Sequence, residues 1–158
     1  MFRIGFGYDA HRLTDGRDLI LGGVRIPHEK GLLGHSDADV LSHAIGEAIL
    51  GALSLGDLGK HFPDTDQKYK NISSLKILSM INDTAKKENA KIINIDSTIV
   101  AEEPKLSGHI PKMRENISDV LNINMDQISV KATTTEGMGF VGKKEGMAAY
   151  AVVLMDKK

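Results

Sequence analysis

The alternation of apolar and polar residues predicts that the chain begins with two strands. Residues 2–13, FRIGFGYDAHRL, and residues 18–26, DLILGGVRI, have the spacing and branched side chains typical of strands. The linking residues 14–17, TDGR, contain Asp-Gly, which is a common hairpin turn. We therefore expect these two strands to form a hairpin.

Three later segments have apolar residues every three or four positions, the pattern of helices that pack on one side. They predict helices over residues 37–56, 73–90 and 108–122. Ser73 or Ser74 is suited to cap the second helix, because a serine oxygen accepts a hydrogen bond from a free N–H group of the first turn.

The remaining apolar segments predict strands over residues 91–103, 128–135 and 146–155. The order strand, strand, helix, helix, strand, helix, strand contains two strand–helix–strand crossovers, the first through two helices. We therefore expect an α/β fold (α+β, two layers), in which helices pack on one face of a mixed β-sheet. No repeat, linker or low-complexity tract interrupts the chain, so residues 1–158 are expected to form a single domain.

The composition narrows the class of protein. Hydrophobic residues make up 41% and charged residues 26%, which is typical of a folded globular chain. The formal net charge of −1 gives no basic surface of the kind that binds nucleic acid. The longest apolar run, residues 147–155, is too short to span a bilayer, and the first residues lack the apolar core of a signal peptide. We expect a cytoplasmic protein, or the mature form of an organellar one such as a plastid-stroma protein.

The chain has no cysteine, so any metal site must use histidine and carboxylate ligands. Asp9 and His11 are two residues apart in the first predicted strand, so their side chains point to the same face. With His43 of the first predicted helix they make a set of two histidines and one carboxylate. Such a set suits zinc with an open fourth position, or a non-haem iron. The alternative is a strand carboxylate beside a helix histidine that only hydrogen-bonds a neighbour.

The segment GHSDAD, residues 34–39, brings His35 and Ser36 to the predicted start of a helix. Serine and aspartate are common caps there, and acidic side chains are favoured in the first turn. The N–H groups of a helix start also bind phosphate, and a hydroxyl can donate to the same group. The pattern is consistent with a cap alone or with a phosphate site.

Three segments rich in turn-forming residues join the predicted elements. Residues 57–71 have no periodicity and are expected to form an acidic loop, and residues 101–109 leave a strand for a helix. Residues 133–146 nearly match a P-loop, but Lys144 stands where a hydroxyl should hold magnesium and a strand follows, which excludes that motif. Their hydroxyls, N–H groups and lysines still suit phosphate, and Glu136 suits a hard cation such as magnesium. Solvated turns are the alternative.

Five segments occur in the order and spacing of one enzyme family: GYDAHRL, LGHSDADVLSHAI, LGDLGKHFPDTD, AEEPKL and KATTTEGMGFVGKKEG. The chain resembles the 2-C-methyl-D-erythritol 2,4-cyclodiphosphate synthases over essentially its whole length. The resemblance implies one catalytic domain that assembles as a homotrimer with active sites between neighbours. It implies a lyase of the non-mevalonate isoprenoid pathway. Its substrate, 4-diphosphocytidyl-2-C-methyl-D-erythritol 2-phosphate, would be attacked by its own 2-phosphate at the β-phosphate, releasing CMP and closing the cyclic diphosphate.

The same resemblance implies roles for particular residues. Asp9, His11 and His43 would hold zinc or another divalent transition metal, and Glu136 would hold magnesium or manganese. His35 and Thr134 would act in catalysis. The residues implied to bind substrate are Asp9, His11, His35, Ser36, Asp57, Leu58, Gly59, Phe62, Pro63, Asp64, Thr65, Asp66, Ala101, Glu102, Glu103, Pro104, Lys105, Leu106, Thr133, Thr134, Thr135, Glu136, Phe140 and Lys143.

Within that set the resemblance implies three subsites. Residues 57–59 and 62–66 would receive the methylerythritol part, and residues 101–106 with Thr133, from a neighbouring subunit, would receive cytidine. Phe140 and Lys143 correspond to an isoprenoid-diphosphate pocket, where the family often has arginine in place of this lysine; lysine lacks the bidentate fork of arginine. Ala38 replaces a frequent glycine, which we expect to be harmless inside a helix.

Two other functions stay open when the residues are considered alone. A zinc phosphohydrolase would use metal-bound water in place of the 2-phosphate and would yield linear phosphates. A non-catalytic module would bind cytidine nucleotides or isoprenoid diphosphates without turnover.

Overall fold

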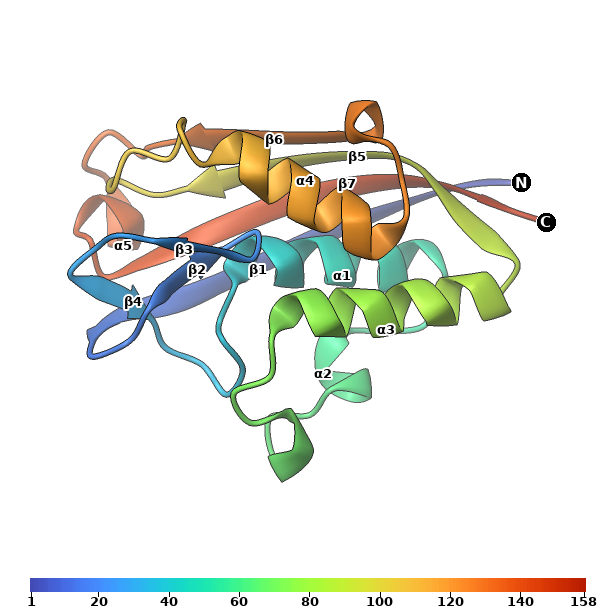
Figure 1. The fold of residues 1–158 in the computed structure, drawn as a ribbon, viewed down its shortest axis with the longest axis horizontal. Coiled ribbons are helices and arrows are strands. Elements are labelled where there is room, and N and C mark those ends of the chain that lie inside the picture. Colours follow the sequence, from blue (N-terminus) through green and yellow to red (C-terminus); the bar gives the residue numbers. More distant parts are fainter.

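A five-stranded mixed sheet is the frame of the computed structural model, which describes residues 1–158 (Figure 1). The strand order is β4-β1-β7-β5-β6, with β5 and β6 parallel and the other neighbours antiparallel. A separate two-stranded ribbon is formed by β2 and β3. The strands are β1 (Phe2–Asp15), β2 (Leu19–Leu21), β3 (Val24–Ile26), β4 (Lys30–Leu32), β5 (Ala90–Val100), β6 (Ile128–Thr133) and β7 (Gly146–Lys157).

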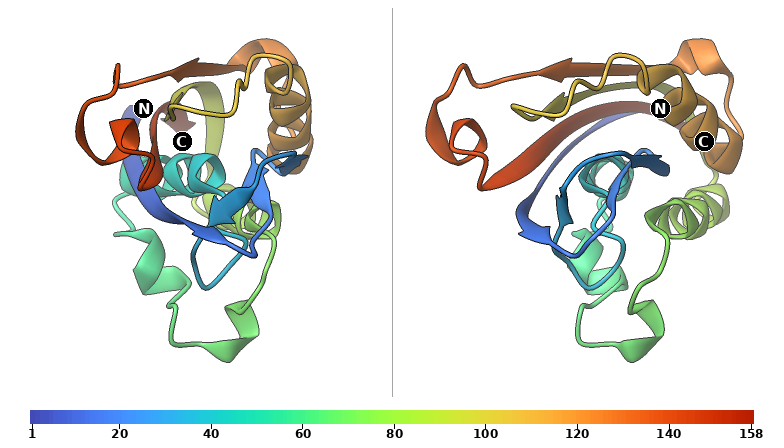
Figure 2. Two further views of the ribbon diagram at one scale, coloured as in Figure 1. Left: turned by 90° about the vertical axis from the view of Figure 1, so that its left-hand side faces the viewer. Right: turned by 60° about the vertical axis from the view of Figure 1, so that its left-hand side comes forward.

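The three long helices cover one face of this sheet, as the two views of Figure 2 show. Helix α1 packs on β1 and β7, α3 packs on α1 and α4, and α4 packs beside β6. This confirms the expected two-layer α/β architecture. None of the helices combines the length and the apolar character needed to cross a membrane. The helices are α1 (Val40–Ala52), α2 (Leu58–His61), α3 (Ser74–Lys87), α4 (Ile110–Leu121) and α5 (Gly139–Gly142), with 3-10 turns η1 (Gln67–Tyr69) and η2 (Met125–Gln127).

The predicted hairpin between residues 2–13 and 18–26 is wrong. Strand β1 pairs at its end with β4, and the second segment folds back on itself as β2 and β3. Gly22 and Gly23 form the turn of that ribbon with φ values of 56° and 70°. Positive φ at both central residues is what the favoured two-residue hairpin turn requires, so the Gly-Gly pair, and not Asp-Gly, makes the hairpin.

Two further boundaries differ from the prediction. Helix α1 begins at Val40 and not at residue 37, because Asp39 has extended backbone angles and caps the first turn. Ala38 therefore lies outside the helix, with a φ of 57°, a conformation that favours glycine. The expectation that Ala38 sits inside a helix is wrong. Residues 57–71 are also not a plain loop, since they contain α2 and η1.

Helix α1 lies unusually close to β1 because two glycines of the strand face it. A Cβ atom at Gly5 would come within 1.8 Å of the Ala48 carbonyl oxygen, and one at Gly7 within 1.9 Å of that of Ala44. The helix backbone thus rests directly on the strand backbone. This contact fixes the position of α1 relative to β1, and with it the distance between any side chains that the two elements direct toward each other.

We expect the Gly5→Ala substitution to destabilise the fold by about 3 kcal/mol or more, because the added methyl group can only be accommodated if α1 moves. Urea unfolding measures the change. Gly108→Ala is the matched control, since a Cβ atom at that glycine meets nothing within 4 Å. Equal stability of the two variants would contradict the backbone contact between α1 and β1.

The sheet face opposite the helices carries a continuous set of exposed apolar side chains. Their exposed fractions range from 43% for Tyr8 and Tyr150 to 73% for Ile4. The Tyr8 and Tyr150 ring centroids are 5.0 Å apart, so the two strands present one surface. Patches of this kind usually mark an interface. The apolar sheet face consists of Phe2, Ile4, Phe6 and Tyr8 of β1 and Tyr150 and Val152 of β7.

Candidate active site

Strand β1 and helix α1 bring two histidines and an aspartate together. Asp9 and His11 point toward the helical layer from β1, and His43 meets them from α1. Asp9 Oδ2 lies 2.8 Å from His11 Nε2 and 3.0 Å from His43 Nδ1, and the two nitrogen atoms are 3.2 Å apart. We refer to these three residues as the metal triad.

The donor set of the metal triad fits a divalent transition metal. Three ligands at about 2.0–2.1 Å from a tetrahedral zinc ion lie roughly 3.3 Å from one another, close to the separations found here. The Leu33 carbonyl oxygen can only accept, so His11 donates to it from Nδ1 at 2.9 Å and presents Nε2 to the triad. The chemistry of nitrogen and carboxylate ligands favours zinc or a similar ion over calcium or magnesium.

Charge in the metal triad is concentrated on Asp9. Burial acts to raise the pKa of Asp9, but the hydrogen bonds and charges of His11 and His43 outweigh burial and lower the pKa to about 2. Burial likewise acts to lower the pKa of His11, but its contact with Asp9 raises that pKa above 6.5. The site therefore favours a carboxylate surrounded by positive charge, whether that charge is a proton or a metal ion.

A buried carboxylate anchors the start of α1, on which His43 is carried. Asp39 accepts hydrogen bonds from the N–H groups of Gly22, Gly23 and Ser42 and from the Ser42 hydroxyl, at 2.8–3.1 Å. Burial raises the pKa of Asp39, as does the charge of Asp37, while these donors act in the opposite direction. The β2–β3 turn is thereby tied to the first turn of α1.

A cavity of about 550 Å³ opens beside the metal triad. It contains many of the residues that the sequence predicts for this part of the site. His35 does not line this cavity; its Nε2 donates to the Asp66 carbonyl oxygen at 2.9 Å. The cavity is lined by Tyr8, Asp9, His11, His43, Glu47, Asp57, Leu58, Gly59, Phe62, Pro63 and Asp64.

Sequence reasoning missed two of these lining residues, Tyr8 and Glu47. Glu47 Oε2 accepts a hydrogen bond from the Leu58 N–H at 2.7 Å, so it holds α2 against α1. Its position four residues after His43 places it on the same face of the helix, and this spacing was the available signal. Tyr8 belongs to the apolar sheet face and reaches the cavity around the edge of the sheet, a placement that no local pattern indicates.

A second group of predicted residues lies at the ends of β5 and β6. Glu102 Oε1 accepts from the N–H and hydroxyl of Thr135, at 2.9 and 3.0 Å, and from the Gly137 N–H at 3.3 Å. These hydrogen bonds lower the pKa of Glu102 and commit its side chain to holding the turn before α5. A cavity of about 340 Å³ lies there, lined by Ala101, Glu102, Pro104, Lys105, Leu106, Ser107, Ala132, Thr133 and Thr134.

The two groups do not meet within one chain. Thr133 is paired with Val100, and Val100 with Ala148, so these residues share the apolar sheet face, whereas Asp9 is paired with Ala149 and points to the helical layer. Strands β7 and β5 separate β1 from β6, which amounts to three strand spacings or roughly 14 Å. Within one chain, Asp9 and Thr133 therefore lie on opposite faces of the sheet.

The last predicted residues lie around α5. Phe140 lines a cavity of about 280 Å³ that also includes Tyr8, His11 and Arg12. Glu136 is exposed and belongs to no cluster of three or more potential metal ligands in the single chain. Lys144 Nζ lies 3.1 Å from Glu103 Oε2, which ties α5 to the 101–106 segment. Lys143 is exposed.

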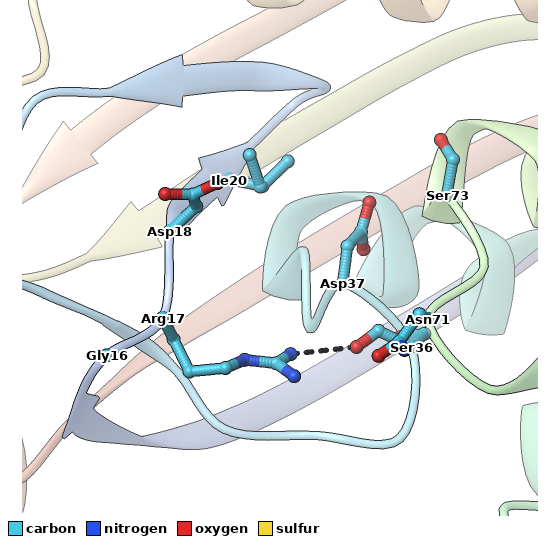
Figure 3. Close-up of a pocket in the computed structure, with 8 residues that line it drawn as sticks. All are labelled: Gly16, Arg17, Asp18, Ile20, Ser36, Asp37, Asn71 and Ser73. Atoms are coloured by element: carbon cyan, nitrogen blue, oxygen red, sulfur yellow. Dashed lines mark hydrogen bonds between the residues drawn. The ribbon is translucent and has the colours of Figure 1, made fainter.

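A separate cavity of about 440 Å³ lies behind the segment that carries His35 and Ser36 (Figure 3). Arg17 donates from Nη2 to the Ser36 carbonyl oxygen at 2.8 Å and from Nε to the Leu32 carbonyl oxygen at 3.1 Å. Asp37 and Ser73 also line this cavity. One arginine therefore holds the backbone at both ends of the 32–36 segment.

The fold and the metal triad define the class of protein: an α/β enzyme with a candidate histidine–carboxylate metal centre beside an acidic cavity. Comparison with known proteins agrees with this class. The model of the YgbB family matches residues 2–156. The chain therefore belongs to the YgbB family, and its relatives are 2-C-methyl-D-erythritol 2,4-cyclodiphosphate synthases, as the sequence motifs predict.

The similarity to these relatives covers nearly the whole chain. The synthase of Clostridium perfringens is 61% identical over 155 residues, which is 98% of this chain and 99% of the relative. That of Syntrophomonas wolfei is 57% identical with the same coverage. IspF of Plasmodium falciparum in complex with CDP has a TM-score of 0.87 at 38% identity, covering 99% of this chain and 97% of that one.

One solved structure contains this fold as a part of a larger chain. The bifunctional IspDF from Campylobacter jejuni matches with a TM-score of 0.96 and 42% identity over 100% of this chain. The present chain spans 43% of the length of that protein.

Proposed function

We propose that the chain converts 4-diphosphocytidyl-2-C-methyl-D-erythritol 2-phosphate to 2-C-methyl-D-erythritol 2,4-cyclodiphosphate and CMP, in the non-mevalonate isoprenoid pathway. The observation that carries this proposal is the metal triad beside an acidic cavity, in a chain 61% identical to a synthase of that name. The complex of a relative with CDP supports a cytidine nucleotide as ligand. The synthases of Clostridium perfringens and Syntrophomonas wolfei are bacterial, which supports the cytoplasmic location expected from the sequence.

The residues of this chain mainly bind, orient and exclude water. Asp9, His11 and His43 would hold a zinc ion, which when bound supplies Lewis-acid polarisation of the β-phosphate. His35 and Ser36 would contact phosphate, and the 57–66 segment would enclose the methylerythritol part. The attacking 2-phosphate is already ionised at neutral pH, so the reaction needs positioning and charge stabilisation more than a proton-abstracting side chain.

The remaining predicted residues would act from a neighbouring subunit. The 101–106 segment and Thr133 would hold cytidine, Thr134 would stabilise the transferring phosphoryl group, and Glu136 would bind magnesium or manganese near the diphosphate. Their separation from the metal triad within one chain supports this arrangement. We also propose that Phe140 and Lys143 belong to a pocket near the subunit junction; lysine provides only a point charge there.

We propose a homotrimer that buries the apolar sheet face. This face is exposed in the single chain and lies on the same side of the sheet as Thr133, so its burial brings the cytidine segment of one copy toward another copy. In a cyclic assembly, the metal triad of each copy lies near the cytidine segment of the next copy. The ring is closed, so no copy is left with an unpaired interface.

Phosphorus NMR of the protein with the cytidyl substrate, zinc and magnesium tests the proposed function. We expect CMP together with two coupled signals from a cyclic diphosphate. CMP accompanied only by linear phosphates would favour a zinc phosphohydrolase. Binding without turnover by the metal-loaded assembly would favour a non-catalytic module.

A further inference from the structure

The ring nitrogen of His43 that points away from Asp9 and His11 lies against two serine hydroxyls. His43 Nε2 is 2.8 Å from Ser74 Oγ and 3.1 Å from Ser36 Oγ. Ser74 is the first residue of α3 and is fully buried, with 0% of its surface exposed. A residue of α3 therefore contacts a metal-triad histidine from the side opposite Asp9 and His11.

The direction of the Ser74 hydrogen bond follows from its other partner. The Asp37 carboxylate accepts from the N–H groups of Asp39 and Ser74, at 3.1 and 3.0 Å, and from the Ser74 hydroxyl. A hydroxyl has one proton, so once Ser74 donates to Asp37 its oxygen can only accept from His43. His43 must then carry its proton on Nε2.

We propose that Asp37 and Ser74 act as a positioning pair that selects the Nε2–H tautomer of His43. In this tautomer the lone pair of Nδ1 points toward Asp9 and His11, where it is available to a metal ion. The opposite tautomer would set a lone pair of Nε2 against those of Ser74 Oγ at 2.8 Å. It would donate from Nδ1 to Asp9 Oδ2, 3.0 Å away, and would leave no lone pair on Nδ1 for a metal ion. The inference rests on the proposed function insofar as that function places zinc there.

The same tautomer has a consequence for Ser36. Ser36 Oγ accepts from the Ala38 N–H at 3.1 Å. A protonated His43 Nε2 shares its single N–H between Ser74 and Ser36 and cannot accept, so neither neighbour requires the Ser36 proton. The hydroxyl is therefore free to donate to a substrate phosphate. Asp37 itself lines the cavity behind this segment (Figure 3), so the pair acts through His43 and Ser36 and does not touch substrate.

Nitrogen-15 NMR of the histidine side chains tests the tautomer directly in metal-free Asp9→Ala protein, which lacks the carboxylate that competes for a proton on His43 Nδ1. We expect His43 in this variant to show a protonated Nε2 and an unprotonated Nδ1 at a pH where the ring is neutral. A proton on Nδ1 in this variant would overturn the inference. This measurement uses neither substrate nor turnover, so it decides the inference even if the proposed reaction or the zinc assignment fails.

The second measurement is zinc affinity, determined by competition with a chelator. Removal of a group that orients a histidine ligand typically weakens binding by about 10–100-fold, and we expect a loss in this range for Ser74→Ala. Ser73→Ala is the matched control, because Ser73 is exposed and its side chain makes no capping bond. Unchanged zinc affinity and an unchanged His43 tautomer in Ser74→Ala would contradict the proposal.

Asp37→Asn provides a variant that leaves Ser74 in place. The amide can donate to Ser74 Oγ, which releases the serine proton and removes the constraint on His43. We expect a mixed tautomer population and weaker zinc binding. A pure Nε2–H tautomer in folded Asp37→Asn would show that Ser74 does not depend on Asp37 and would overturn the role of the pair.

Discussion

Asp9→Asn is expected to lower the rate of CMP release by at least about a thousand-fold. A bound metal ion contributes several kcal/mol of charge stabilisation, and each 1.36 kcal/mol is a factor of ten in rate. Asn keeps the size of the side chain but removes the charge of the group that lies within 3.0 Å of both histidines. His43→Ala is expected to have a similar effect, since it removes the ligand from α1. Steady-state turnover, metal content and circular dichroism together measure the result.

Matched controls separate loss of the metal triad from a general loss of charge or of histidine. Asp83→Asn removes an exposed carboxylate of α3 whose partner is Lys86, at 3.7 Å, and His28→Ala removes a histidine outside the triad. Both should retain normal turnover. A folded Asp9→Asn protein that holds no zinc and yet works normally would refute the metal assignment.

Val152→Glu is expected to dissociate the assembly and to reduce turnover by more than about 100-fold. The side chain is 45% exposed in the single chain, so the free subunit tolerates a charge there. Burial of an unpaired carboxylate in an interface costs about 3–5 kcal/mol, which is more than two factors of ten. Loss of the assembly would separate the metal triad from the cytidine segment of the neighbour. Sedimentation velocity and turnover, measured on the same sample, test both effects.

Met80→Glu is the matched control for this substitution. Met80 is an exposed apolar residue of α3, in the helical layer, so the same charge is added away from the apolar sheet face. We expect it to remain assembled and active. An active monomer, whether of the wild type or of Val152→Glu, would contradict the proposal that the site is built from two chains.

Local sequence patterns place Asp9 and His11 side by side but do not by themselves show that His43 meets them. The two-residue spacing of Asp9 and His11 is enough to place them on one face of a strand. His43 reaches them because α1 packs closely on β1. This close packing is possible only because Gly5 and Gly7 have no side chains. Such a contact is between residues some forty positions apart, and periodicity carries no information about it.

The errors of prediction at the start of α1 have a common physical cause, which is that polar side chains there bind distant backbone groups. Asp37 was predicted to lie within the first helix. Its carboxylate instead accepts hydrogen bonds from the N–H and the hydroxyl of Ser74, the first residue of α3. Asp39, two residues later, caps α1 and also binds the β2–β3 turn. Local patterns locate a cap within a few residues but do not show which distant N–H groups share the carboxylate.

The two ends of the chain lie side by side, which matters for how this domain combines with others. The terminal ammonium of Met1 is 3.0 Å from Asp156 Oδ1, and β1 and β7 are paired from Phe2 to Arg12 (Figure 1). Asp9 is seven residues further along β1 than Phe2, roughly 23 Å away. A second catalytic unit could therefore be fused at either end without crowding the metal triad. The bifunctional Campylobacter jejuni protein, of which this fold is about two fifths, is an example in which this fold is part of a longer chain with two functions.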